Sequence, residues 1–240
     1  MGLSLRAREI ITATGDLFLP RTCLVCGRSL LRKERHLCIW CREDLPRTWQ
    51  WTLPRNAMAD RFNSLIQRNL SEYEPYSRAA ALFFYQGGYR QIPQAVKYRH
   101  NRRAGQDFGR ELGRLLSGSP LFADVDAVLP VPLHPLRRWR RGYNQAEIIA
   151  RAVAAEMGVP CLNRILRRRR RTRTQTRLHG AEKAANVQGA FSARPLPARH
   201  ILLIDDVFTT GATLAACHFA LRKVTRARIS AATLAFVGSV

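Results

Sequence analysis

Acidic residues are scarce in this chain of 240 residues, since 17 Asp and Glu stand against 40 Lys and Arg for a formal net charge of +23. This imbalance favours a polyanionic partner, such as nucleic acid, an anionic membrane surface or a phosphorylated ligand. No apolar run approaches the roughly 18 residues that a membrane-spanning helix needs, so we expect no membrane span. Hydrophobic residues still make up 46% of the chain, which excludes global disorder.

The N-terminal segment also lacks the pattern of a secretory signal. Its apolar residues are interrupted by Arg6, Arg8, Glu9 and Asp16, which leaves no apolar core for a signal peptide. We therefore expect a cytoplasmic protein, in which thiols stay reduced.

Four cysteines form two Cys-x-x-Cys pairs, Cys23 with Cys26 and Cys38 with Cys41. Two such pairs separated by a short insert can place four thiolates at the corners of a tetrahedron, which is the geometry of a closed structural zinc site. Two disulfides are the first alternative, and the reducing compartment argues against them. A redox-active pair is the second, and the nearby second copy argues against it. We expect a structural zinc ion bound by all four cysteines.

Three other potential metal ligands are set aside. His36 lies in the insert between the two pairs and could replace a ligand, although four cysteines already fill the site. Cys161 and Cys217 have no partner at metal-ligand spacing, and we expect both to be small buried apolar residues.

The remaining pattern predicts an α/β fold with a parallel sheet, because apolar strands alternate with amphipathic helices. We expect strands at 79–85, 126–132, 200–204 and 228–237, and helices at 59–69, 144–157 and 212–224 with two more between 89 and 116. We divide the chain into an N-terminal helix and zinc knuckle at 1–50, a linker at 51–74 and the α/β domain at 75–240. Lys97 and Tyr98, at one helix end, could contact an anion, but we favour a solvated helix end.

One segment carries the strongest chemical signal. The apolar run 200–204 leads directly into Asp205 and Asp206, and a loop rich in Thr then opens a helix. Ligands bind at the carboxyl ends of parallel strands, and backbone N–H groups at a helix N-terminus suit a phosphate. Two acids beside such a loop suit a sugar diol and, through water, Mg²⁺. The predicted phosphate loop contains Thr209, Thr210, Gly211, Ala212 and Thr213.

This segment resembles the signature of type I phosphoribosyltransferases. The resemblance implies that Asp205 and Asp206 bind the ribose hydroxyls of phosphoribosyl pyrophosphate, that the following loop binds its 5′-phosphate, and that an earlier loop binds pyrophosphate through its backbone. That earlier loop corresponds to Pro130, Val131, Pro132 and Leu133. We add Arg141, because a guanidinium donates paired hydrogen bonds to phosphate oxygens. Arg137 and Arg138 fit solvated surface charge.

Further motifs make the chain similar to the ComF/GntX family of phosphoribosyltransferase-like proteins, which are linked to competence and the use of external DNA. They are the four cysteines, the run from Arg141 to Ala146, Thr172 to Gln175 with Leu178, Asn186 to Phe191, and Asp205 to Thr213. Two positions depart from the family pattern: Tyr143 replaces Phe, and Lys183 replaces Arg. Lys183 keeps the charge but loses the planar guanidinium.

The stretch from Arg164 to Arg177 contains eight arginines. In type I enzymes the corresponding region is a mobile hood over the reacting sugar. The five consecutive arginines at 167–171 could instead bind nucleic-acid phosphates without sequence preference. The candidate hood or nucleic-acid residues are Arg167, Arg169, Arg171, Arg173, Gln175 and Asn186. Base stacking is possible for Trp49, Trp51, Trp139 and Tyr143, although single aromatics more often pack in a core.

Two functions follow from these observations. In the first, a competence-related module binds a phosphoribosyl pyrophosphate-type ligand with Mg²⁺ and single-stranded DNA, and docks a DNA-uptake helicase or another competence protein. In the second, the chain is an active phosphoribosyltransferase that transfers the sugar phosphate to an unidentified acceptor and releases pyrophosphate. No dedicated general base is recognisable, so no catalytic residue is assigned.

Overall fold

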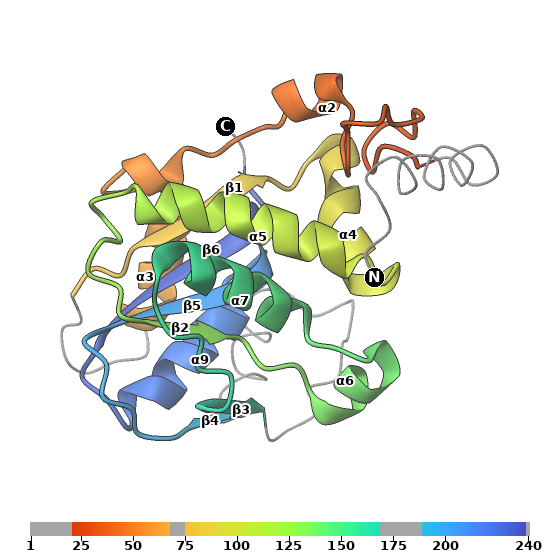
Figure 1. Ribbon diagram of the computed structural model, residues 1–240. Coiled ribbons are helices and arrows are strands. Elements are labelled where there is room, and N and C mark those ends of the chain that lie inside the picture. Colours follow the sequence, from red (N-terminus) through yellow and green to blue (C-terminus); the bar gives the residue numbers. More distant parts are fainter. Residues whose placement is uncertain (1–20, 68–74, 169–188, 239–240) are drawn as a thin grey trace, which may run out of the picture.

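The computed structural model describes residues 21–67, 75–168 and 189–238. At its centre lies a four-stranded parallel sheet, in the spatial order β1 (Ala79–Phe84), β6 (Arg228–Phe236), β5 (His200–Phe208) and β2 (Ala127–Pro130) (Figure 1). The expectation of an α/β fold with a parallel sheet is confirmed.

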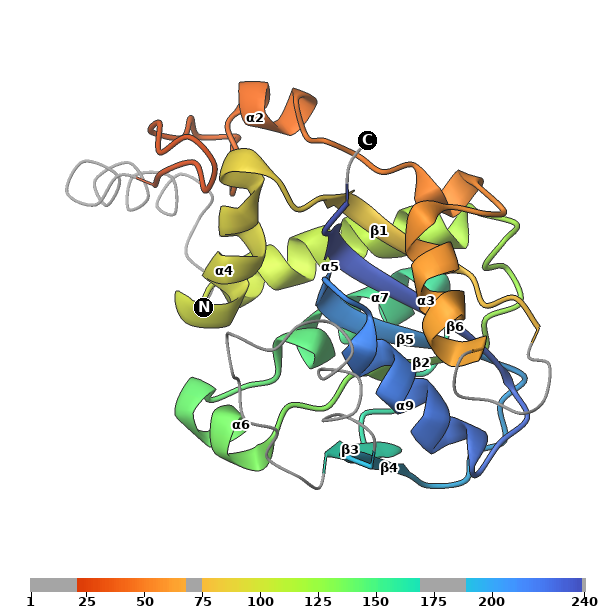
Figure 2. The same ribbon diagram turned by 180° about the vertical axis from the view of Figure 1, so that it is seen from behind.

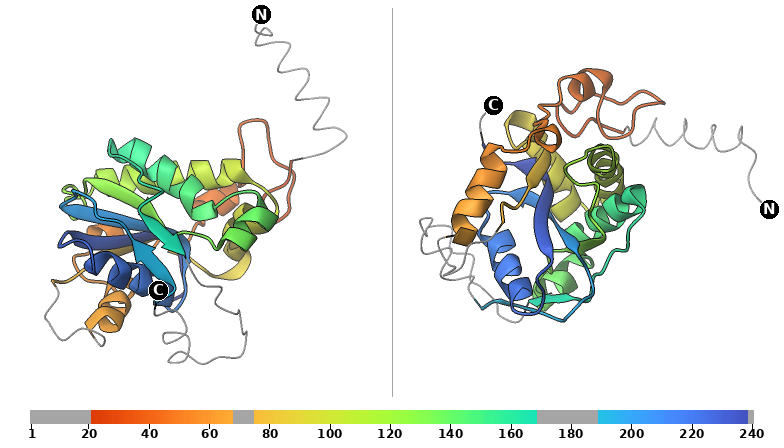
Figure 3. Two further views of the ribbon diagram at one scale, coloured as in Figure 1. Left: turned by 90° about the horizontal axis from the view of Figure 1, so that it is seen from below. Right: turned by 90° about the vertical axis from the view of Figure 1, so that its left-hand side faces the viewer.

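Helices cover both faces of the sheet. On one face lie α4 (Gln91–Tyr98), α5 (Arg102–Ser117) and α7 (Gln145–Met157), and on the other lie α3 (Ala57–Gln67) and α9 (Ala212–Arg222) (Figures 1 and 2). Seen along the sheet, the two layers stand on either side of the strands (Figure 3). Every residue of β1 is buried, as expected for a strand covered on both faces.

Helices α5 and α7 approach closely because glycines line the contact. A Cβ atom at Gly109 would lie 2.9 Å from the Cβ of Ala152, and one at Gly113 would lie 2.9 Å from the Cβ of Glu156. Any larger side chain at these two positions would push the helices apart. This packing supports β2 and β5, whose ends carry the candidate site.

The remaining elements are short. They are α2 (Ile39–Glu43), the 3₁₀ turns η1 (Gln50–Thr52) and η2 (Gly87–Arg90), α6 (Pro135–Arg141), and an antiparallel ribbon of β3 (Leu166–Arg168) and β4 (Phe191–Ala193). The ribbon was not predicted.

The strand expected at 200–204 continues to Phe208, so the two acids lie within β5 rather than after it.

None of the helices in the described parts of the chain combines the length and the apolar character that a membrane crossing requires.

Candidate functional sites

The four predicted cysteines form one cluster near the N-terminus. The Sγ atoms of Cys23, Cys26, Cys38 and Cys41 all lie within 4.8 Å of one another, and those of Cys26 and Cys38 are 3.7 Å apart. A tetrahedral zinc site with Zn–S bonds of about 2.3 Å has S···S edges of about 3.8 Å. All six cysteines of the chain are free thiols. The donor set therefore fits a structural zinc ion and leaves no coordination position open.

Local backbone structure positions these thiols. Gly27 has a φ of 74° and donates its N–H to the carbonyl of Cys23 at 3.0 Å, which closes the first knuckle. In the second knuckle, Cys38 precedes helix α2 and Cys41 lies within it. Burial by itself opposes ionisation of Cys23, but backbone hydrogen bonds at Cys26, Cys38 and Val25 lower its pKa to about 7.

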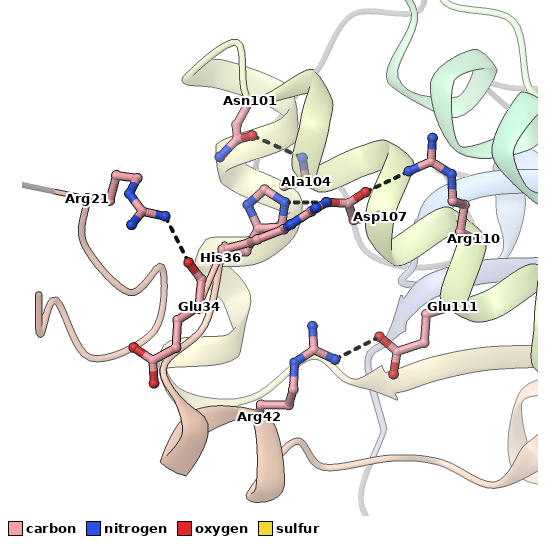
Figure 4. Close-up of polar contacts among 10 residues, drawn as sticks. Arg21, Glu34, His36, Arg42, Asn101, Ala104, Asp107, Arg110 and Glu111 are labelled. Carbon is pink, nitrogen blue, oxygen red and sulfur yellow. Dashed lines mark hydrogen bonds and ion pairs between the residues drawn. The ribbon is translucent and has the colours of Figure 1, made fainter. Parts of the chain in front are cut away.

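The other three potential ligands lie elsewhere. His36 is outside the cluster, and its Nε2 atom lies 3.0 Å from Oδ2 of Asp107 on α5 (Figure 4). Cys217 is fully buried, as expected. Cys161 is only half-buried, because it lies at the edge of the sheet beside Val128, with which it forms an isolated bridge.

A second candidate site lies where β5 and β2 end. Asp206 is 3% exposed, and its Oδ2 atom lies 2.7 Å from Nζ of Lys97 at the end of α4. Burial opposes the charge of Lys97, but the Asp206 carboxylate outweighs it and raises the pKa of the lysine. The favoured interpretation of Lys97 as part of a solvated helix end is wrong. Sequence reasoning missed its role because the partner lies on a distant strand.

The neighbouring carboxyl group, Asp205, has a raised pKa. Its Oδ1 atom accepts a hydrogen bond from the backbone N–H of Asp206 at 2.9 Å. Burial and then the charge of Asp206 raise the pKa of Asp205 to about 8.

The loop after β5 leads into helix α9, and its role as an anion cradle stays a prediction. Thr209 and Thr210 are exposed, and Gly211 caps α9 with a φ of 81°. A Cβ atom at Gly211 would lie 2.5 Å from the ring of Phe208, so this position requires glycine for space as well as for backbone angle. Arg61 of α3 donates to the carbonyls of Thr209 at 3.0 Å and Val237 at 2.9 Å. Arg61 is a further positioning residue that no sequence motif indicated.

The Pro130–Leu133 loop lies beside the acid pair. Pro130 is in register with Ile204, and the N–H of Val131 donates to the carbonyl of Ile204 at 2.8 Å. The amide of Asn144, at the start of α7, donates to the carbonyl of Val131 at 3.0 Å. Pairing of two parallel strands thus brings together two loops that lie far apart in the sequence.

Arg141 is half-buried and fixed on two sides. It donates to Oε1 of Gln145 at 2.5 Å, and its guanidinium lies 5.2 Å from the centre of the Tyr98 ring. Tyr98 follows Lys97, so Arg141 lies on the same side of the molecule as the acid pair. The phosphate-binding role of Arg141 stays a prediction.

Tyr143 has a structural role. Its side chain is buried, its hydroxyl donates to the carbonyl of Val96, and the guanidinium of Arg102 lies 4.6 Å from the centre of its ring. The hydroxyl that distinguishes it from the family's Phe therefore ties the start of α7 to the end of α4, next to Lys97. Trp51 is buried as well, so neither of these rings can stack on bases. Trp139 and Trp49 remain exposed, at 82% and 55%.

A basic cavity of about 500 Å³ opens beside the Pro130–Leu133 loop. Five arginines line it, and these are Arg138, Arg164, Arg167, Arg168 and Arg194. The acid among them, Glu147, is already paired with Arg151 at 2.8 Å and accepts from Asn163 at 2.6 Å. The predicted residues Arg169, Arg171, Arg173, Gln175 and Asn186, together with Lys183, lie outside the described residues.

The chain is similar to proteins named for competence and for DNA utilization. It is 40% identical to Competence protein F of Haemophilus influenzae over 103 residues, which are 41% of this chain and 45% of that protein. It is 27% identical to the DNA utilization protein YhgH of Salmonella typhimurium over 208 residues, covering 83% and 89% of the two chains. The YhgH protein of Escherichia coli K12 is 29% identical over 201 residues, covering 80% of each chain. No protein family model matches. The names of these relatives refer to competence and to DNA utilization, as the motifs predicted. They confirm that the chain resembles the ComF/GntX family.

Proposed function

We propose that the chain serves DNA uptake or the use of external DNA, and that the carboxyl edge of its sheet binds a phosphoribosyl pyrophosphate-type ligand with Mg²⁺. The names of its relatives support the first part. The observation that carries the second is the acid pair of β5, which is followed directly by a glycine-capped loop that opens α9. Carboxylates and a helix N-terminus side by side suit a ligand with both a diol and a phosphate.

In this proposal each part of the carboxyl edge of the sheet binds a different part of the ligand. Asp205 and Asp206 accept hydrogen bonds from the ribose hydroxyls and hold Mg²⁺ through water, since carboxylate oxygens are the donors that this ion prefers. The loop from Thr209 to Thr213 binds the 5′-phosphate. The Pro130–Leu133 loop and Arg141 bind the pyrophosphate end.

We further propose that single-stranded DNA crosses the basic cavity. Arg164, Arg167 and Arg194 are exposed around it, and α6 adds Arg137, Arg138 and Arg140 beside the exposed ring of Trp139. Cationic side chains with an exposed aromatic ring are the elements of sequence-independent single-strand binding. The charge balance supports this placement, because residues 61–200 carry 26 basic and 9 acidic side chains, a net charge of +17.

Transferase activity is the second candidate. The observation that favours it is Asp205, whose pKa of about 8 would let it exchange a proton with an acceptor near neutral pH. An incoming nucleophile would displace pyrophosphate from the anomeric carbon, and the electron pair of the broken C–O bond would leave with pyrophosphate.

Calorimetric titration with Mg²⁺ and phosphoribosyl pyrophosphate tests the ligand site. We expect saturable binding to the wild type and none to the Asp205→Asn/Asp206→Asn variant. The control Glu43→Gln removes an exposed acid elsewhere and should bind normally. Absence of binding to folded wild type would overturn the ligand proposal.

Anisotropy of a labelled oligonucleotide tests the DNA site separately. Affinity should fall steeply between about 50 and 200 mM salt and should drop further in Arg164→Gln/Arg194→Gln than in the matched control Arg28→Gln/Arg55→Gln. Equal losses in both variants would mean that binding follows net charge alone. Release of pyrophosphate in the presence of nucleobases, lost in the acid-pair variant, would establish the transferase instead.

A further inference from the structure

A groove of about 590 Å³ lies between the cysteine module, residues 21–45, and helix α5 (Figure 4). It is on a different part of the molecule from the acid pair and from the basic cavity, and it shares no lining residue with that cavity. The functions considered above leave it without a role.

The two acids that α5 contributes to this groove already contact the cysteine module. Asp107 lies 3.0 Å from His36 and 2.7 Å from Arg110. Glu111 lies 2.6 Å from Arg47, which is outside the groove, and 3.3 Å from Arg42.

The third acid, Glu34, accepts the backbone N–H groups of Leu31 and Ile39, both at 2.7 Å. Glu34 therefore orders the backbone of the module itself, whereas Asp107 and Glu111 join the module to α5.

The lining of the groove carries more cations than acids, because five cationic residues stand against Glu34, Asp107 and Glu111. The five cationic residues are Lys33, Arg35, Arg42, Arg110 and Arg114. The side chain of Arg35 is 76% exposed and lies 3.6 Å from Asp107, whereas that of Arg114 is 67% exposed and 3.8 Å from Glu156. Exposed pairs at such distances are worth little, so both guanidinium groups can take a carboxylate partner without losing a strong contact.

The module side of the groove also carries exposed apolar side chains. Leu31 is 70% exposed and Ile39 is 58% exposed, and Trp40, next to Ile39, is 65% exposed. A metal-stabilised segment this short can fold without burying such side chains, but exposed apolar surface beside a charged rim is typical of an interaction site.

We propose that this groove docks an acidic amphipathic segment of a partner protein. Carboxylates of the segment would pair with the cations of the groove, and its apolar side chains would cover Leu31 and Ile39. Nucleic acid suits the groove less well than the basic cavity, because three carboxylates line the groove whereas one lines the cavity. A phosphate backbone would also leave Leu31 and Ile39 without an apolar partner.

Selection from a phage-displayed library of random 12-residue peptides on the zinc-loaded full chain tests the proposal. We expect enrichment of peptides that combine Asp or Glu with Leu, Phe or Trp. Their affinity, measured by anisotropy, should fall at least about tenfold in Leu31→Ser/Arg114→Gln, because docking energy concentrates in a few central contacts. The control Leu53→Ser/Arg103→Gln removes an exposed leucine and an exposed arginine outside the groove and should bind normally.

Several outcomes would overturn the proposal. One is a selection that does not enrich peptides combining acidic and apolar residues. Another is that the enriched peptides bind both variants with equal affinity. A tenfold loss of oligonucleotide binding in Leu31→Ser/Arg114→Gln alone would assign the groove to nucleic acid. A dimer in light scattering that this variant dissociates would assign it to a second copy of the chain. The ligand site at the sheet edge stays intact in both variants, so failure here is distinguishable from failure of the proposed function.

Discussion

Nζ of Lys97 lies 2.7 Å from Oδ2 of Asp206, and this ion pair joins the end of α4 to the end of β5. It places a positive charge beside two adjacent carboxyl groups, of which Asp206 is buried and Asp205 is partly exposed. The candidate ligand site is therefore a three-membered charge cluster, Lys97, Asp205 and Asp206, rather than an acid pair alone.

The first prediction concerns this pair. Lys97→Met should lower the free energy of unfolding by roughly 3 kcal/mol, because it leaves a buried carboxylate without its counter-charge. Lys97→Met/Asp206→Leu should recover most of that loss, since both charges are then gone. Urea denaturation of the single and double variants measures the coupling. Lys223→Met, on the exposed end of α9, is the control, and an equal effect of the two lysine substitutions would contradict the assignment.

The second prediction concerns the loop after β5. Gly211→Ala adds a Cβ atom at a φ of 81° and 2.5 Å from the Phe208 ring, so we expect a loss of roughly 1–3 kcal/mol in the free energy of unfolding. Binding of inorganic phosphate or a ribose phosphate should weaken in parallel. Gly158→Ala, at a φ of 68° with no atom near the added Cβ, isolates the backbone contribution. If both variants lose the same stability, contact with Phe208 does not matter.

The third prediction concerns acid stability. His218 is fully buried, and neither ring nitrogen has a hydrogen-bond partner among the described residues. Burial, and then the charge of Arg222, lowers its pKa from 6.5 to about 3. The unfolded chain therefore binds a proton in a pH range where the native state does not. Above pH 6.5 this residue is neutral in both states and does not reduce the free energy of unfolding. As pH falls from 6.5 toward 3, the free energy of unfolding decreases progressively, because only the unfolded chain takes up the proton.

The variant His218→Leu checks this sign. It should reduce the loss of stability between pH 6.5 and 5, measured by denaturation at each pH, and it should not destabilise the protein at pH 7, because it removes an unsatisfied buried polar group. A pH profile identical to that of the wild type would show that His218 does not contribute to acid unfolding.

The fourth prediction concerns the cysteine cluster. Elemental analysis should find one zinc ion per chain, lost in Cys38→Ser but kept in Cys161→Ser. Metal loss should lower the melting temperature by several degrees, because Cys23, Leu30 and Leu37 share a core cluster with Phe83 and Phe108 of the main domain. Full zinc content in Cys38→Ser would exclude the four-cysteine site.

Features encoded within a few residues were predictable. The spacing of Cys23, Cys26, Cys38 and Cys41 indicated their cluster, because each knuckle is a local turn closed by its own backbone hydrogen bonds. The order of strands and helices followed from apolar runs and their boundaries, although β5 continues past Asp205 and Asp206 to Phe208. The short β3–β4 ribbon was missed because three-residue strands beside an arginine run leave no periodic signal.

The fold class, the cysteine cluster and the acid pair could all be predicted from the sequence, because each leaves a local pattern of residue types. The folded structure is needed to see which side chains meet: Lys97 with Asp206, Arg61 with the loop at Thr209, and the Tyr143 hydroxyl with Val96. It also shows that the cysteine module lies on α5 and leaves a groove there. Such contacts depend on how whole helices and strands pack together, so no local pattern of residue types predicts them.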